Sequence, residues 1–290
     1  MMAAQEITLH TPNGCFAALA WPNPGAPRLM CLHGWLDNAA SFLPLSPFLA
    51  AFDVVALDFA GHGHSDHRPA GARYYMMDNL WDLDIVLDAL GWPNCHLAGH
   101  SLGGVVACTF AAAAPGRVDR LVALDGLGPL SARPGDTTSR IRASLVSFRK
   151  PRGKLRDYPD IAAAARARQR ASGLPFEASS LLCERSMSRR NGVYRWRTDP
   201  ELNWHSPLLM SEEQVLDILG AISIPTLSIT ASPLSDWMNP AVVEKRLAAV
   251  PECTSHTVEG HHHFHMDQPQ HTGQLILDFL NAPERTHERR

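Results

Sequence analysis

The sequence predicts an α/β fold, with a mostly parallel eight-stranded β-sheet flanked by helices and an inserted helical cap. Short apolar runs alternate with helix-like runs through most of the chain. Several apolar runs end in Gly or Asp, as central parallel strands that lead into loops do. After Asp125 this rhythm stops for roughly ninety residues, longer than an ordinary connection. We therefore assign 1–129 and 211–290 to the core and 130–210 to the cap.

The first half of the core begins with a predicted hairpin. Two β-rich runs flank Pro12-Asn13-Gly14, whose Asn-Gly pair supplies the positive backbone angles that a tight turn needs. A helix is predicted over 77–90, because its leucines recur at helical spacing and Gly91 follows as a C-terminal cap. The predicted strands of this half are 7–9, 16–19, 29–32, 54–57, 95–98 and 121–125.

Helices dominate the predicted cap. One runs from Asp160 to near Gly173, and a second covers about 179–188. The core resumes where Ser211 and Gln214 have the spacing of a capping box at a helix start. The remaining predictions are strands 225–229 and 254–258, helices 240–250 and 268–280, and a frayed polar tail over 282–290.

Composition limits the classes of partner. A net charge of −3 over 290 residues argues against general affinity for nucleic acid. The longest apolar run, 105–114, is shorter than the ~20 residues that a membrane span requires. The N-terminus lacks the basic start and apolar run of a signal peptide, so we expect a cytoplasmic protein. The six cysteines form no Cys-x-x-Cys pair, which is typical of reduced, packed thiols.

The clearest chemical signal is Gly-x-Ser-x-Gly at 99–103, placed between an apolar strand and a helix-like run. In such a tight turn, side chains at Gly99 and Gly103 would collide, and Ser101 is left projecting above the sheet. The start of the following helix favours negative charge that develops beside the serine. Ser101 is therefore the candidate nucleophile.

A serine nucleophile needs a base, and in the chain order Ser, acid, His the base lies late in the sequence. The histidine cluster at 261–265 follows the last predicted strand and precedes the last predicted helix, at the sheet edge from which Ser101 projects. One of these histidines is the candidate base. The alternative is a metal site with the alternating ligands His261, His263, His265 and Asp267. Because nothing else in the sequence suggests a second shell, we expect no metal and no cofactor.

Two loops beside the predicted elbow carry further signals. The backbone N–H groups of Trp35 and Leu102 are candidates for an oxyanion hole, worth typically ~3 kcal/mol per donor. The Trp35 side chain is also a candidate for the pocket wall. The Gly-rich loop 58–65 is interpreted as a tight turn after a strand, with a structural role.

Four segments match one known family: 33–35, 58–65, 99–104 and 260–269. Together they resemble the α/β-hydrolase superfamily over nearly the whole chain outside the cap. Residues 194–200 and the paired histidines near the end are similar to the serine hydrolase-like branch of that superfamily. The resemblance implies Ser101 as nucleophile, His262 as base and His265 as a downstream auxiliary histidine.

The acid of the implied triad departs from the family pattern. In most members an Asp follows the strand equivalent to 226–230, but the expected position holds Leu234, which cannot orient an imidazolium. Asp236 lies two residues later. Some hydrolases of this fold take the acid from the end of the preceding strand, where this chain has Asp125. We favour Asp125 because an Asp at the end of a buried strand needs a partner, although it alternatively only caps its loop.

The resemblance implies hydrolysis of a carboxylic ester or related acyl substrate by Ser101, His262 and Asp125, through an acyl-enzyme. Serine at the elbow excludes the chemistry of haloalkane dehalogenases and epoxide hydrolases, which use Asp there. One alternative is a cofactor-free carbon–carbon bond hydrolase with the same triad. Another, prompted by Leu234, is a catalytically weakened protein that binds a small molecule.

The predicted cap is strongly basic. Residues 130–200 hold fourteen Arg and two Lys against six acidic residues, so the local charge is +10 and the remainder carries −13. Since caps of this fold lie over the pocket, an anionic small-molecule acyl substrate would suit this charge. The alternative is that most of these arginines are solvated surface.

Overall fold

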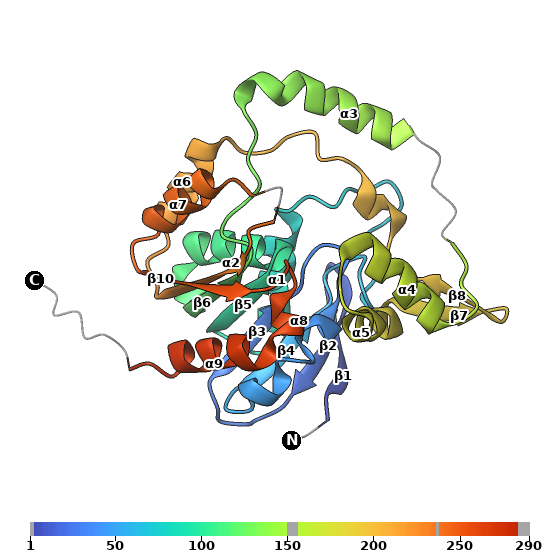
Figure 1. The fold of residues 1–290 in the computed structure, drawn as a ribbon, viewed down its shortest axis with the longest axis horizontal. Coiled ribbons are helices and arrows are strands. Elements are labelled where there is room, and N and C mark those ends of the chain that lie inside the picture. Colours follow the sequence, from blue (N-terminus) through green and yellow to red (C-terminus); the bar gives the residue numbers. More distant parts are fainter. Residues whose placement is uncertain (1–2, 150–155, 236–237, 284–290) are drawn as a thin grey trace, which may run out of the picture.

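Eight strands form one sheet in the order β1-β2-β4-β3-β5-β6-β9-β10 (Figure 1). The computed structural model describes residues 3–149, 156–235 and 238–283. Only β2 runs antiparallel to its neighbours, β1 and β4, which confirms the predicted mostly parallel sheet. The strands are β1 Gln5–Thr11, β2 Gly14–Trp21, β3 Arg28–Leu32, β4 Asp53–Leu57, β5 Cys95–His100, β6 Val118–Leu124, β9 Thr226–Ser232 and β10 Cys253–Glu259.

The predicted N-terminal hairpin is present, but its turn differs from the prediction. Thr11 pairs with Gly14, so the two loop residues are Pro12 and Asn13. Within the Asn-Gly pair only Gly14 has a positive φ, of +123°. The proline ring fixes φ of the first loop residue near −65°, so the turn reaches its positive φ only where the second strand begins.

Helices cover both faces of the sheet, because the central strands are apolar on both sides. In β3, Met30 and Leu32 pack into one cluster, while Leu29 and Cys31 pack into the other. The first cluster is covered by α1 (Asp78–Ala89), α2 (Leu102–Ala113), α6 (Glu212–Gly220) and α7 (Pro240–Ala249). The second is covered by the 3-10 turns at Ala39–Phe42 and Ser46–Leu49, by α8 (Phe264–Asp267) and by α9 (Pro269–Leu280).

The capping signals behave as the sequence predicts. Gly91 has φ of +65° and follows Leu90, the C-cap residue of α1. Ser211 and Gln214 form the predicted capping box at the start of α6, with both reciprocal hydrogen bonds present. Of the predicted tail, residues 284–290 lie outside the described residues. No helix in the described part of the chain has the length and apolar character needed to cross a bilayer.

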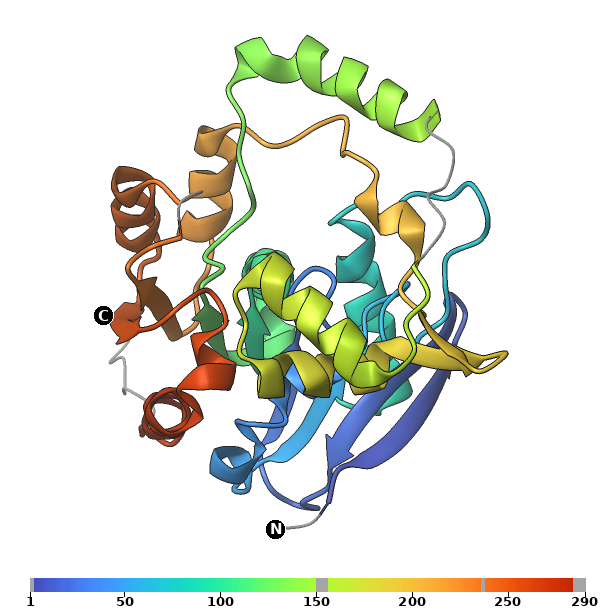
Figure 2. The ribbon, with the colours of Figure 1, turned by 45° about the vertical axis from the view of Figure 1, so that its right-hand side comes forward.

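The segment between β6 and α6 contains α3 (Thr137–Arg149), α4 (Ile161–Ser172), α5 (Phe176–Ser186) and a small hairpin of β7 (Met187–Arg190) and β8 (Val193–Trp196). The two helices predicted in this segment correspond to α4 and α5, although α5 begins three residues earlier than predicted and residues 187–188 belong to β7. Asp160 caps α4 by accepting a hydrogen bond from Ala163 N, and Gly173 ends it with φ of +74°. The sequence did not predict α3 or the hairpin. None of the α3 residues is buried, and this helix lies apart from the sheet in both views (Figures 1 and 2).

Two arginines of this segment anchor it to the loops that follow β3 and β4. Arg185 of α5 is buried, contacts the fully buried Asp58 carboxylate at 2.8 Å, and also binds Glu6. Arg168 of α4 pairs with Asp37 Oδ1. The segment is thus fixed against the edge of the sheet at which the strands of the parallel core end.

Candidate active site

The turn at Ser101 joins β5 to α2 and has a strained backbone. Ser101 has φ of 51° and ψ of −114°, a combination that L residues rarely adopt. A Cβ on Gly99 would overlap the backbone of Gly103, as the sequence predicts. A Cβ on Gly103 would instead overlap the carbonyl of Leu32 at the end of β3, so this glycine is required by the neighbouring strand. Strain persists where the surrounding structure fixes it, which is typical of a functional turn.

Hydrogen bonds hold the Ser101 backbone in place. Its N–H donates to the Leu124 carbonyl of β6 at 2.9 Å, and its carbonyl accepts from Val105 N at 3.0 Å. Leu102 is the first residue of α2, so its N–H has no carbonyl within the helix to bind. The serine therefore lies at the positive end of the helix dipole, beside N–H groups that can stabilise an anion.

Asp125 directly follows β6, which pairs with β5, and it therefore lies on the strand next to the Ser101 turn. Its carboxylate is fully buried, and Oδ2 lies 2.6 Å from His262 Nδ1. The other oxygen, Oδ1, accepts a hydrogen bond from Ala231 N at 3.0 Å. Because a carboxylate accepts, His262 carries its proton on Nδ1 and presents the lone pair of Nε2, as a general base requires.

His262 lies in the loop between β10 and α8, and this loop is held against the strand that leads to Ser101. The Nε2 atom of His100 lies 2.9 Å from the His262 carbonyl, and the two rings are 4.7 Å apart. His100 immediately precedes Ser101. The structure thus joins Asp125 to His262 directly, and ties the His262 backbone to the residue next to Ser101.

The loop that follows β3 and contains Trp35 begins next to the start of α2. A Cβ on Gly103 would contact the carbonyls of both Leu32 and His33, so the loop and the first turn of α2 are packed together. The Trp35 ring is half exposed, and its Nε1 donates to the Leu202 carbonyl at 3.3 Å. Trp35 and Leu102 are therefore on adjacent segments, and the role of their N–H groups in an oxyanion hole stays a prediction.

Two buried histidines hold these loops in place, and both rings are neutral. His33 Nε2 accepts a hydrogen bond from Phe59 N at 3.0 Å, and His62 Nε2 accepts from Leu36 N at 3.2 Å. An accepting nitrogen cannot carry a proton, so both rings must be neutral. Burial lowers the pKa of His33 to about 4 and that of His62 to about 3, which keeps them so at neutral pH.

The contacts of Asp58 agree with a structural interpretation of the loop 58–65. Its oxygens accept from Ala39 N at 2.7 Å and from His64 N at 2.8 Å, and they pair with Arg185. Gly63 has φ of +50°, and a Cβ there would overlap the Asp58 carboxylate. Both oxygens of this carboxylate are therefore bound to backbone N–H groups and to Arg185.

Other candidates from the sequence occupy different places. Asp236 lies outside the described residues. His265 is fully buried, with Nε2 2.7 Å from Ser41 Oγ, and its described contacts do not include Ser101. Among the described residues, the alternating His261, His263, His265 and Asp267 do not form one ligand group: the rings of His263 and His265 are stacked 6.0 Å apart, and His263 Nε2 lies 3.1 Å from Asp37 Oδ2.

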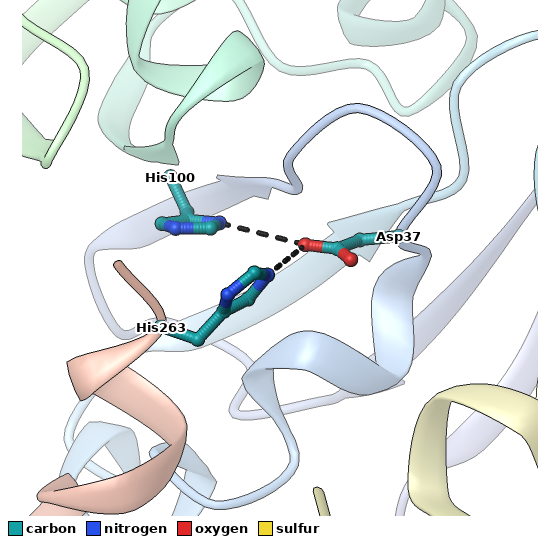
Figure 3. Close-up of side chains that lie close together, drawn as sticks. All are labelled: Asp37, His100 and His263. Carbon is teal, nitrogen blue, oxygen red and sulfur yellow. Dashed lines mark hydrogen bonds and ion pairs between the residues drawn. The ribbon is translucent and has the colours of Figure 1, made fainter. Parts of the chain in front are cut away.

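Sequence reasoning missed a cluster of Asp37, His100 and His263 beside His262 (Figure 3). These residues come from the loop after β3, the end of β5 and the loop before α8. Histidines 100 and 263 belonged to motifs already recognised, but no spacing in the sequence connects them to Asp37.

Comparisons with known proteins agree with this architecture. Residues 27–269 match the family model described as alpha/beta hydrolase fold. A serine hydrolase-like protein of Dictyostelium discoideum is 32% identical over 301 residues, covering 95% of this chain and 81% of the relative. Serine hydrolase-like protein 2 of Homo sapiens is 30% identical over 305 residues, covering 96% and 94%. The crystal structure of a hypothetical protein from Pseudomonas aeruginosa PAO1 has a TM-score of 0.89 at 33% identity, covering 96% and 100%. The chain therefore belongs to the α/β-hydrolase fold family and, within it, to the serine hydrolase-like branch.

Proposed function

We propose that this protein is a serine hydrolase that cleaves a carboxylic ester or related acyl substrate. Ser101 is the nucleophile, His262 the general base and Asp125 the acid that orients His262. The observation that carries the proposal is the 2.6 Å hydrogen bond between His262 Nδ1 and the buried Asp125 carboxylate, on the strand next to the Ser101 turn. A buried acid that orients a late histidine beside an elbow serine is the arrangement that acyl transfer needs.

In the first half of the reaction, Ser101 Oγ attacks the acyl carbon while His262 Nε2 takes the Oγ proton. The carbonyl electron pair moves onto its oxygen, which is bound by the N–H groups of Trp35 and Leu102. When this intermediate collapses, the bond to the alcohol oxygen breaks and His262 gives its proton to the leaving alkoxide. The acyl group remains on Ser101 as an ester.

In the second half, water attacks the acyl-enzyme and gives a proton to His262. The carboxylic acid leaves, and the proton returns to Ser101 Oγ. Asp125 keeps its charge throughout and stabilises the imidazolium that forms twice in each turnover. The Ala231 N–H bond fixes the carboxylate so that it can do so without rearranging.

We further propose that 130–210 acts as a helical cap that selects a small-molecule acyl substrate. Arg168, Arg185 and Arg195 of this segment are already paired with acidic residues, so its excess positive charge is only partly available to a ligand. Selection of an anionic substrate is tested by comparing two esters that differ only in a carboxylate. Preference for the charged ester, lost at high salt, supports charge selection.

The proposed activity is tested with aryl esters of increasing acyl length, comparing wild type with Ser101→Ala. We expect turnover by wild type, and we expect the rate at which the variant releases the phenol to be lower by several orders of magnitude. Inactivity on every ester, together with turnover of a vinylogous diketone, would contradict ester hydrolysis and favour carbon–carbon bond cleavage by the same residues.

A further inference from the structure

The buried cluster of Asp37, His100 and His263 contains a ring nitrogen whose hydrogen-bonding capacity is not met by the described residues. Asp37 Oδ2 lies 3.1 Å from His263 Nε2 and 3.6 Å from His100 Nδ1, and Figure 3 shows both rings directed at the same carboxylate. The side chains of Asp37 and His100 are at most 1% exposed. His100 Nδ1 has no hydrogen-bond partner within the described residues.

The two contacts of the His100 ring explain why its Nδ1 atom cannot bind Asp37 as a donor. Its Nε2 lies 2.9 Å from the His262 carbonyl, which can only accept, so the proton belongs on Nε2. The lone pair of Nδ1 then faces the lone pairs of Asp37 Oδ2. The other neutral tautomer is no better, because it places the Nε2 lone pair against the carbonyl.

Adding a second proton to His100 is opposed by its surroundings. The ring is fully buried and lies within 4.7 Å of the rings of His262 and His263. Burial disfavours the charged form of an imidazole, so this enclosed position favours a ring with a single proton. An uncharged His100 leaves two buried acceptors facing each other, and a bound cation would resolve this arrangement.

We propose that Asp37 Oδ2, His100 Nδ1 and His263 Nε2 form a binding site for a divalent transition-metal ion such as Zn²⁺. In a tetrahedral zinc site, metal–ligand bonds of ~2.0 Å place the ligand atoms roughly 3.3 Å apart. The two measured separations, 3.1 and 3.6 Å, lie on either side of this value, and all three ligand atoms lie within 4.8 Å of one another.

The contacts around the cluster support this assignment. A histidine that binds a metal usually donates its other ring N–H to a carboxylate or backbone carbonyl, and His100 has this arrangement with the His262 carbonyl. Two imidazole nitrogens and one carboxylate favour zinc and similar ions over Mg²⁺ or Ca²⁺, which prefer oxygen ligands. The ion would be bound in part by the loop that carries His262, through His263, but would not use the His262 side chain.

Arg168 makes the site sensitive to charge. Its guanidinium pairs with Asp37 Oδ1, the oxygen that faces away from the two histidines, and so repels a cation bound at Oδ2. Replacement of this arginine by an uncharged residue should therefore strengthen metal binding. A like charge at close range in a partly buried site is worth about tenfold or more in affinity.

The test is equilibrium dialysis of the whole chain against Zn²⁺, with the visible absorption of bound Co²⁺ as a second readout of the ligand set. We expect one ion per chain in wild type, and His263→Gln should bind at least about 100-fold more weakly, because a direct ligand is lost. His261→Gln is the matched control, since it removes an exposed histidine two residues away. Arg168→Gln should bind about tenfold more tightly.

Three results would overturn the proposal: less than stoichiometric binding by wild type, equal loss in His261→Gln and His263→Gln, or weaker binding by Arg168→Gln. Asp37→Asn gives a second ligand variant, and thermal unfolding without metal shows which variants are folded. Neither readout requires substrate, so the result does not depend on the proposed hydrolase activity.

Discussion

The carboxylate of Asp125 and the imidazole of His262 are separated by 137 positions in the sequence and joined by a 2.6 Å hydrogen bond. Asp125 reaches this position from the end of β6, and the N–H of Ala231 at the end of β9 holds its second oxygen. An acid from the end of β6 is therefore hydrogen-bonded to the end of β9, the strand after which most members of the family carry their acid. This relationship accounts for Leu234 after β9 without requiring loss of the proposed triad.

Asp125→Asn tests the role of this carboxylate. The substitution keeps the shape of the side chain but removes the charge that stabilises the His262 imidazolium. We expect kcat/KM for a reactive ester to fall by about 10⁴-fold, with little change in thermal stability. The measurement is steady-state hydrolysis, with circular dichroism as a check of the fold.

Asp236→Asn is the companion variant, because the sequence left this residue as the rival acid. We expect it to retain activity close to that of wild type. A collapse of activity in Asp236→Asn, with Asp125→Asn unaffected, would reverse the assignment.

The geometry of the Ser101 turn predicts that the stability of the folded protein depends strongly on the absence of a side chain at Gly99. In Gly99→Ala the new Cβ would overlap the backbone of Gly103, which cannot move without displacing α2. We expect the free energy of unfolding in urea to fall by about 3 kcal/mol or more. Gly116→Ala is the control, because a Cβ there meets no atom within 4 Å, and its effect should stay within about 1 kcal/mol. Equal effects of the two substitutions would contradict this description of the turn.

Arg185→Met should destabilise the protein strongly. Arg185 is the cationic partner of Asp58, whose carboxylate is fully buried, and removing it leaves that charge without compensation. We expect a loss of about 3–5 kcal/mol in urea unfolding. Arg195→Met, which breaks the exposed pair with Asp157, should have no measurable effect. If the two variants unfold at the same urea concentration, Arg185 does not anchor the inserted segment as described.

Stability should fall as the pH is lowered from 7 to 5, because buried histidines are neutral in the folded protein. The pKa of His62 is about 3 when folded and near 6.5 when unfolded, so in this range the unfolded chain binds more protons. Protonation of this histidine in the unfolded chain should by itself make the free energy of unfolding about 2 kcal/mol lower at pH 5 than at pH 7. His62→Gln cannot titrate, so its loss of stability between the two pH values should be smaller than that of wild type. A loss as large as that of wild type would contradict the assigned neutral state.

The core of the fold could be predicted because its signals are local. Buried parallel strands appear as short apolar runs, and the Ser101 turn is marked by the glycines that its geometry requires. Capping residues such as Ser211 and Gly173 indicated where helices begin and end. By contrast, α3 was missed although Ile141, Leu145 and Phe148 recur at helical spacing, and these apolar side chains are exposed in the structure.

Contacts between distant loops could be predicted only in part. The sequence left Asp125 and Asp236 as competing acids, since the choice depends on how the ends of β6 and β9 meet. The alternating histidines suggested one ligand set, but α8 begins at Phe264 and turns His265 toward Ser41, whereas His263 contacts Asp37. The Asp37 cluster combines three segments that are far apart in the chain, and no local pattern links them.

The most direct test of the central claim is labelling of the folded protein with a fluorophosphonate, followed by mass spectrometry of its peptides. We predict one phosphonylated site, at Ser101, and no labelling of Ser101→Ala. Labelling of a different residue, or none in folded wild type at high probe concentration, would contradict the assignment of Ser101 as an activated nucleophile.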